Sequence, residues 1–130
     1  MLTSTPKHIS RRVALQAFDA LSERWRLPRK DWPAILHKSE STIYAWLREA
    51  KEGHPHAETP LDADVAERLS HLLSIYNGLH ILFGDARFAD EWIYANNQAF
   101  GGQPPVRLLK SGAFEDLLAV RKYIDRANSL

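Results

Sequence analysis

The amino-acid sequence predicts an all-α fold, on three observations. Apolar residues recur at spacings of three and four along several segments, which is the period of one buried helix face. No segment shows sustained alternation of apolar and polar residues with β-branched enrichment, and no Asn-Gly hairpin turn occurs. Capping residues, glycine and proline stand at the ends of these segments, where helices are expected to begin and end. We therefore expect six or seven helices in two packed groups.

Three helices are predicted in the first half of the chain. Ser10 can N-cap the first, and Ser39 can N-cap the third, which runs to about Glu52 before the C-cap Gly53. The short helix between them contains Pro33, which a helix tolerates only in its first turn. The side chains expected to face the core are Val13, Ala14, Ala17, Phe18, Leu21, Trp25, Trp32, Ile35, Leu36, Ile43, Trp46 and Leu47.

A Pro-rich stretch divides the chain. We expect a flexible tail at 1–9, a first domain at 10–53, a linker at 54–60 and a second domain at 61–130. The second domain should hold a long helix over 61–82 and a helix around 88–93, then a loop at 96–105, a short helix near 106–109 and a last helix over 114–124. Its apolar positions are Leu61, Val65, Leu69, Leu72, Leu73, Tyr76, Leu79, Phe83, Phe88, Ala89, Trp92, Ile93, Phe114, Leu117, Leu118, Val120 and Ile124.

The composition excludes several classes of protein. The chain has 130 residues and no cysteine, so disulfides, thiol nucleophiles and cysteine-based metal sites are excluded. No apolar run approaches the roughly 18 residues that a membrane span needs, and no apolar signal-peptide core follows the N-terminus. We therefore expect a cytoplasmic protein without membrane contact.

No pattern of residues predicts catalysis, a metal site or a cofactor. His54 and His56 stand in the Pro-rich segment without a carboxylate framework, and His71 and His80 are too far apart on one helix to ligate one ion. Neighbouring acidic pairs on the helices point in different directions and are best interpreted as solvated. No nucleophile or nucleotide-binding motif occurs, so we do not expect an enzyme.

The two halves of the chain differ in charge. The formal net charge is +1, but residues 1–60 hold 10 Lys and Arg against 7 Asp and Glu, whereas residues 61–130 hold 7 against 9. The halves therefore carry about +3 and −2, which hints at two surfaces with different partners.

Residues 29–49 have the pattern of a helix-turn-helix, in which a short bracing helix supports a second helix that lies in the DNA major groove. With Ile43 and Leu47 inward, the outer face of the second helix carries hydroxyls and one guanidinium, which suit phosphates and base edges. A structural alternative stays open, in which the three helices only pack, dimerise or support the C-terminal half of the chain. The candidate DNA-binding residues are Arg29, Lys30, Lys38, Ser41, Thr42, Tyr44 and Arg48.

The stretch Ser-Thr-Ile-Tyr-Ala-Trp-Leu at 41–47 resembles the recognition helix of the Xre (phage-repressor-like) family. Three positions depart from that family. Pro33 replaces the usual small residue of the bracing helix, His37 replaces the usual turn glycine, and Lys38 replaces an apolar residue.

Residues 75–124 carry a second, more specific pattern. An apolar helix ending in Phe-Gly-Asp is followed by a helix with tryptophan, an Asn-rich turn, a Gly-Gly-x-x-Pro loop and a Leu-Leu-x-x-Gly helix. These five elements, in this order, resemble the toxin-binding domain of the Xre/MbcA/ParS antitoxins. Physically, Gly84 can take a positive φ at a helix end, Asp85 can cap the next helix, and Trp92 suits the core. The residues of this structural motif are Gly84, Asp85, Trp92, Gly101, Gly102, Pro104 and Gly112.

The resemblance, which covers roughly residues 10–127, implies an antitoxin whose partner is a RES-domain toxin that consumes NAD. It implies binding over the toxin's active site, dimerisation, and repression of its own operon through operator DNA. The alternative is a stand-alone, dimeric DNA-binding regulator. Candidate toxin contacts, chosen as exposed groups on the loop and last helix, are Phe100, Gln103, Arg107, Lys110, Arg121 and Lys122.

Overall fold

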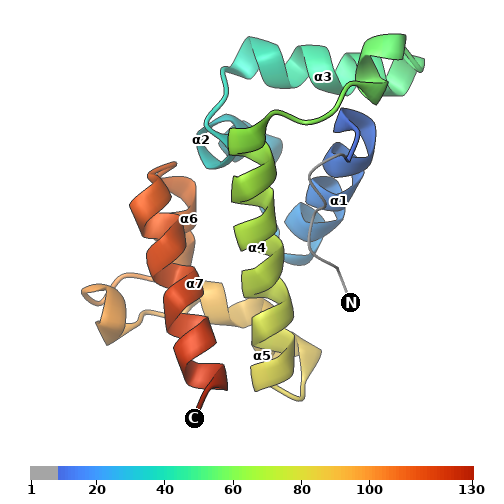
Figure 1. Ribbon diagram of the computed structural model, residues 1–130. Helices are drawn as coiled ribbons and strands as arrows, with labels where there is room; N and C mark the ends of the chain where they lie inside the picture. Colours follow the sequence, from blue (N-terminus) through green and yellow to red (C-terminus); the bar gives the residue numbers. More distant parts are fainter. Residues whose placement is uncertain (1–8) are drawn as a thin grey trace.

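The computed structural model describes residues 9–130, and within them the protein is all-α, as predicted (Figure 1). The first half of the chain contains α1 (Arg11–Arg24), α2 (Trp32–Leu36) and α3 (Glu40–Glu52), with short 3₁₀ turns η1 (Arg29–Asp31) and η2 (Pro55–Glu58). The second half contains α4 (Ala63–Leu82), α5 (Ala86–Glu91), α6 (Pro105–Lys110) and α7 (Phe114–Asn128), with the turns η3 (Trp92–Tyr94) and η4 (Gln98–Phe100). Of the tail predicted at 1–9, residues 1–8 lie outside the described residues, whereas Ile9 is half-buried and packs against the core.

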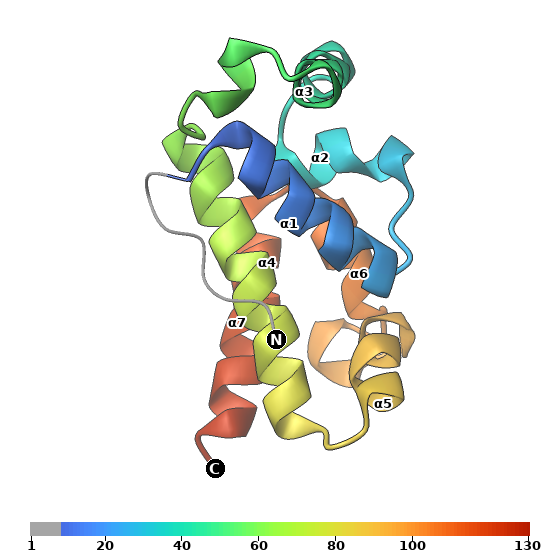
Figure 2. The same ribbon diagram turned by 90° about the vertical axis from the view of Figure 1, so that its right-hand side faces the viewer.

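The long helix α4 lies at the centre of the molecule, with α1, α2, α5 and α7 packed against it (Figures 1 and 2). Helix α7 runs parallel to α4, and both helices end at the same end of the molecule. One continuous core joins the two halves, because α4 is buried against α1 on one side and against α7 on the other. Leu69, Leu72 and Leu79 of α4 are completely or almost completely shielded from solvent.

Capping explains where the first helices begin. The hydroxyl of Ser10 accepts a hydrogen bond from the backbone N–H of Val13 at the start of α1. Ser39 does the same for Thr42 at the start of α3, and α3 ends at Gly53 in the left-handed conformation. Each cap satisfies a backbone group that the first or last helical turn leaves without an internal partner. These three predicted helix boundaries are confirmed.

The Pro-rich segment at 54–60 is more ordered than its composition suggests. It contains η2, in which Ala57 is only 2% exposed. The backbone N–H of Arg11 donates to the carbonyl of Thr59 at 2.9 Å, and that of Leu61 donates to the carbonyl of Ile9 at 3.1 Å. The segment is therefore fastened to the start of α1.

Three expectations about individual residues are wrong. Phe88 is 67% exposed, because α5 is short and buries only one side, represented by Ala89. Val13 is exposed while Leu15 is buried, because the inner face of α1 is rotated by one position from the stripe that the spacing suggested. Gly84 has no positive φ, since α4 ends where Phe83 turns extended, at φ −108° and ψ 129°.

Candidate DNA-binding and partner-binding surfaces

Helix α3 presents a polar outer face. Ser41, Tyr44 and Arg48 are exposed, with Tyr44 at 56%, while Ile43 on the inner face is buried. Trp46 is half-buried beneath the guanidinium of Arg11, 5.1 Å from the ring centroid, so α3 is held against α1 by its inner side. The outer face is consequently free to meet a large ligand such as a DNA groove.

The start of α3 is tied together by hydroxyl groups. Ser39 accepts from the Thr42 N–H at 3.2 Å and donates to the Thr42 hydroxyl at 2.9 Å, and its oxygen lies 3.2 Å from the Ser41 hydroxyl. Thr42 is half-buried and part of this cap, whereas the Ser41 side chain is exposed. Of the serine and threonine predicted to contact DNA, Ser41 is therefore the more accessible.

Arg29 and Lys30 are exposed on η1, next to α3. The Arg29 guanidinium lies over the Trp32 ring at 5.4 Å, which fixes the position of its charge. A shallow hollow is lined by residues of both elements, so the structure brings the predicted cations of η1 and α3 to one surface. Its lining residues are Arg29, Tyr44, Leu47, Arg48, Lys51 and Glu52.

Lys38, the remaining predicted phosphate contact, has an internal partner. Its ammonium lies 2.8 Å from the Oδ2 of Asp62, the N-cap of α4. Partial burial by itself would raise the pKa of Asp62, but the hydrogen bonds from Lys38 and from the backbone of Val65 outweigh it and lower the pKa below its ordinary value. Lys38 therefore links the turn before α3 to α4.

The predicted toxin contacts fall into two groups. Gln103, Arg107 and Lys122 are exposed, as expected of residues that meet a partner. Phe100 is half-buried and packs against the rings of Trp92 and Tyr123, with centroids 6.4 and 5.3 Å away. It is thus part of an aromatic cluster that supports the loop after η3.

Lys110 and Arg121 are also half-buried and hold internal partners. The Lys110 ammonium lies 3.2 Å from Oδ2 of Asp31, the residue before α2. Arg121 on α7 donates from Nη1 to Nδ1 of His71 on α4 at 2.8 Å. Burial and the nearby charge of Arg121 lower the pKa of His71, because both oppose a second positive charge there. His71 thus joins α4 to α7 in its neutral form.

The loop between η3 and α6 is built by its motif residues. Gly101 and Gly102 have φ values of +69° and +82°, which glycine adopts without strain. Asn97 and Gln103 face each other in an isolated antiparallel bridge, and Pro104 leads into α6. At the start of α5, Asp85 accepts a hydrogen bond from the backbone N–H of Arg87 and caps that helix.

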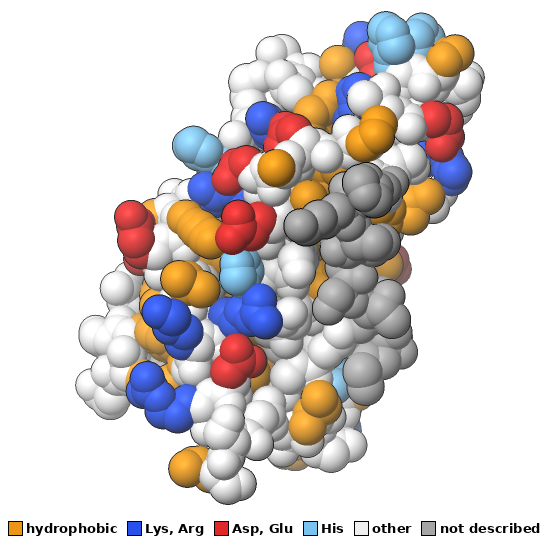
Figure 3. All heavy atoms as spheres, viewed as in Figure 1, with side chains coloured by type: hydrophobic (Ala, Val, Ile, Leu, Met, Phe, Trp, Pro, Cys, Tyr) orange, Lys and Arg blue, Asp and Glu red, His pale blue; other side chains and the backbone are white. Residues whose placement is uncertain are grey.

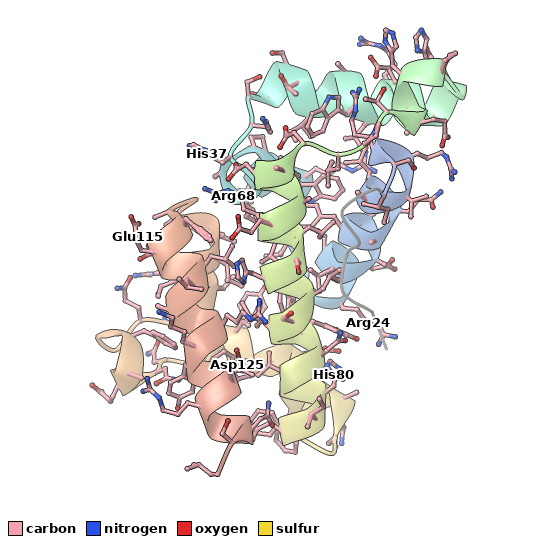
Figure 4. The ribbon with its side chains drawn as sticks, in the orientation of Figure 1. Arg24, His37, Arg68, His80, Glu115 and Asp125 are labelled. Carbon is pink, nitrogen blue, oxygen red and sulfur yellow. The ribbon has the colours of Figure 1, made fainter. Side chains whose placement is uncertain are left out.

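Sequence reasoning missed Arg68, which is only 5% exposed on α4. Its guanidinium donates to the carbonyl of Gly112 at 2.8 Å and to Oδ2 of Asp64 at 3.2 Å, and it lies over the Phe114 ring. Figure 4 shows Arg68 on the upper part of α4, on the side of α7 and Glu115. The sequence contained one sign of this burial, because the position of Arg68 between Val65 and Leu72 places it on the apolar stripe of α4.

The face formed by α4 and α7 carries cations and acids side by side (Figure 3). Within residues 9–130 no cluster of three or more His, Cys, Asp or Glu has a geometry that could hold a metal ion. Over the same residues no helix is long and apolar enough to cross a bilayer.

Comparison with known proteins identifies the two halves. Residues 6–74 match the family model of the antitoxin Xre-like helix-turn-helix domain, and residues 79–129 match that of the antitoxin Xre/MbcA/ParS C-terminal toxin-binding domain. The chain is also 37% identical over 125 residues to the uncharacterised protein y4oB of Sinorhizobium fredii, which covers 94% of this chain and 91% of that protein. The two domain matches, in this order along one chain, show that the protein belongs to the Xre/MbcA/ParS-type antitoxins.

Proposed function

We propose that this antitoxin neutralises a RES-domain, NAD-consuming toxin by binding over its active site, and that it represses its own operon through α3. The observation that carries the proposal is the presence, in one chain, of an exposed polar helix in a helix-turn-helix domain and of a separate toxin-binding domain. The identity of the toxin rests on the resemblance of residues 75–124 to antitoxins with RES-domain partners.

On the DNA side, we propose that Tyr44 reaches base edges while Arg29, Lys30 and Arg48 contact phosphates. The exposure of these side chains and the hollow that Arg29 shares with Arg48 support this assignment. Ser41 and Thr42 complete the contacts at the helix start, where backbone N–H groups favour a phosphate. Few cations are available, so binding should be weak, sensitive to salt and dependent on a homodimer that places two copies of α3 on the DNA.

On the toxin side, we propose that Gln103, Arg107 and Lys122 make direct contacts, because all three are exposed and neither Arg107 nor Lys122 forms an ion pair within residues 9–130. Phe100, Lys110 and Arg121 would act at the edge of the same surface, where their internal partners hold them in position. Such a protein acts in the cytoplasm by binding, without a cofactor or a catalytic step of its own.

The test combines the purified protein with a RES-domain toxin and follows NAD consumption. We expect NAD loss to fall to the background rate at a stoichiometric amount of antitoxin. Arg107→Glu combined with Lys122→Glu should weaken inhibition, whereas Arg48→Ala, on the DNA face, should leave it unchanged. Undiminished NAD consumption at excess wild-type antitoxin would overturn the proposal.

A second candidate is the stand-alone DNA-binding regulator, which the exposed Tyr44 and Arg48 favour by themselves. If the protein is such a regulator, it should bind the DNA fragment upstream of its own gene. It should not inhibit the activity of a toxin encoded nearby. If the protein does not bind such a fragment at low salt, this candidate fails. The proposed neutralisation of a toxin would not be affected by that result.

A further inference from the structure

The turn between α6 and α7, residues 111–113, contacts the bracing helix α2 through backbone atoms. Gly112 has φ +78°, and a Cβ at this position would lie 2.6 Å from the carbonyl oxygen of Ala34 in α2. Real side chains do not approach a backbone oxygen so closely, so any residue larger than glycine must push the turn and α2 apart. The backbone of the toxin-binding domain and that of the helix-turn-helix are therefore in direct contact.

The same turn is fixed on two other sides. The buried Arg68 of α4 donates to the Gly112 carbonyl at 2.8 Å, so a movement of Gly112 away from α4 would break this partly buried hydrogen bond. One residue before the turn, Lys110 forms its ion pair with Asp31 at the start of α2. Because these contacts hold the turn between α4 and α2, a displacement of residues 111–113 also displaces α2.

The carbonyl that Gly112 touches also closes the turn of the helix-turn-helix. Ala34 accepts the backbone N–H of His37 at 3.2 Å, and Pro33 accepts that of Lys38 at 2.9 Å. His37 takes the left-handed conformation that directs the chain into α3. A shift of the Ala34 carbonyl therefore changes the direction in which α3 leaves the turn.

We infer that Gly112 is a positioning residue for α3, so that the α6–α7 turn of the toxin-binding domain sets the orientation of the DNA-reading helix. This inference rests on the proposed DNA-binding function and names a residue outside the helix-turn-helix that positions its reading helix.

A pair of glycine substitutions tests the inference. Gly112→Ala introduces backbone strain and the collision with Ala34, whereas Gly102→Ala, at φ +82° with no atom within 4 Å, introduces the strain alone. We expect Gly112→Ala to weaken binding to the upstream DNA fragment on the order of tenfold, within the usual range of coupling between sites. Gly102→Ala should bind DNA like the wild type, although both variants lose thermal stability.

Amide resonances provide the second measurement, which does not depend on DNA. Gly112→Ala should shift the resonances of residues 34–48, and Gly102→Ala should leave them in place. If Gly112→Ala does not fold, Arg68→Met replaces it, because this change releases the Gly112 carbonyl while filling a similar volume. Unshifted α3 resonances and unchanged DNA affinity would overturn the inference. If the wild type binds no DNA, the proposed function fails, while the resonances still decide whether Gly112 positions α3.

Discussion

Lys38 and Asp62 form an ion pair that joins the turn before α3 to the first residues of α4, with Nζ and Oδ2 2.8 Å apart. The other carboxylate oxygen of Asp62 accepts the backbone N–H of Val65 at 2.9 Å. One carboxylate therefore both caps the central helix and holds the helix-turn-helix beside it.

The ion pair makes part of the stability depend on pH. The folded pKa of Asp62 is lowered, so its charged form stabilises the fold above the ordinary value of 3.8, and this contribution disappears as pH falls through the lowered pKa. Asp62→Asn keeps a capping side chain but loses the ion pair. Because both side chains are partly exposed, we expect a loss of about 0.5 kcal/mol at neutral pH. Asp62→Ala should cost about 1 kcal/mol more through loss of the cap.

Urea unfolding from pH 7 down to pH 2 measures both effects. The stability gap between wild type and Asp62→Asn should close at the acidic end. A gap that stays constant over the whole range would contradict the role assigned to the charge.

His37 holds a left-handed backbone conformation, at φ 56° and ψ 48°. Residues with a side chain pay a steric cost there that glycine avoids, although glycine loses more entropy on folding. We expect His37→Gly to raise the free energy of unfolding by about 0.5–1 kcal/mol. His37→Ala retains the strain and should give no gain. Thermal and chemical unfolding of the two variants compare them directly, and equal stability would show that the strain is negligible.

Gly78 allows α4 and α7 to approach closely. A Cβ at this position would lie 2.5 Å from Cγ2 of Ile124, and the Gly78 carbonyl accepts a hydrogen bond from Asn128 at 3.0 Å. Although alanine favours helices, we expect Gly78→Ala to cost about 1–3 kcal/mol through overpacking. Gly84→Ala, with no atom within 4 Å, is the control and should change stability by less than about 0.5 kcal/mol. A stable Gly78→Ala protein would mean that the two helices separate easily.

Arg48 offers a test of how α3 meets DNA. If its guanidinium contacts a phosphate, Arg48→Ala should weaken binding and reduce the slope of log affinity against log salt by about 1. Arg87→Ala removes another exposed cation, on α5 and away from α3, and should change neither quantity. Fluorescence anisotropy at several salt concentrations gives both values. If Arg48→Ala binds DNA with the wild-type affinity, α3 is not the helix that contacts DNA.

The sequence predicted the helices well where local chemistry determines them. Ser10, Ser39 and Gly53 mark helix ends because their caps involve only neighbouring residues. The substitution of a turn glycine by His37 could also be recognised, since the conformation at that position is fixed by its own turn.

Contacts between distant segments could not be predicted in the same way. Lys38, Lys110 and Arg121 were expected to face a ligand, and each has a partner on another helix: Asp62, Asp31 and His71. A charged residue looks the same in a sequence whether its partner is DNA, a toxin or a helix fifty residues away. The burial of Arg68 and the exposure of Phe88 depend on tertiary packing for the same reason.

The place of α4 between the two halves has a consequence for shortened forms of this protein. Its side chains complete the core around Phe18 and Trp25 in the first half and around Val120 and Ile124 in the second. A chain cut at the Pro-rich segment would leave α1 to α3 with bare apolar surface, and such a fragment would aggregate or be degraded. A nonsense mutation anywhere before α7 should therefore abolish both binding activities together, and neither half would survive as an independent product.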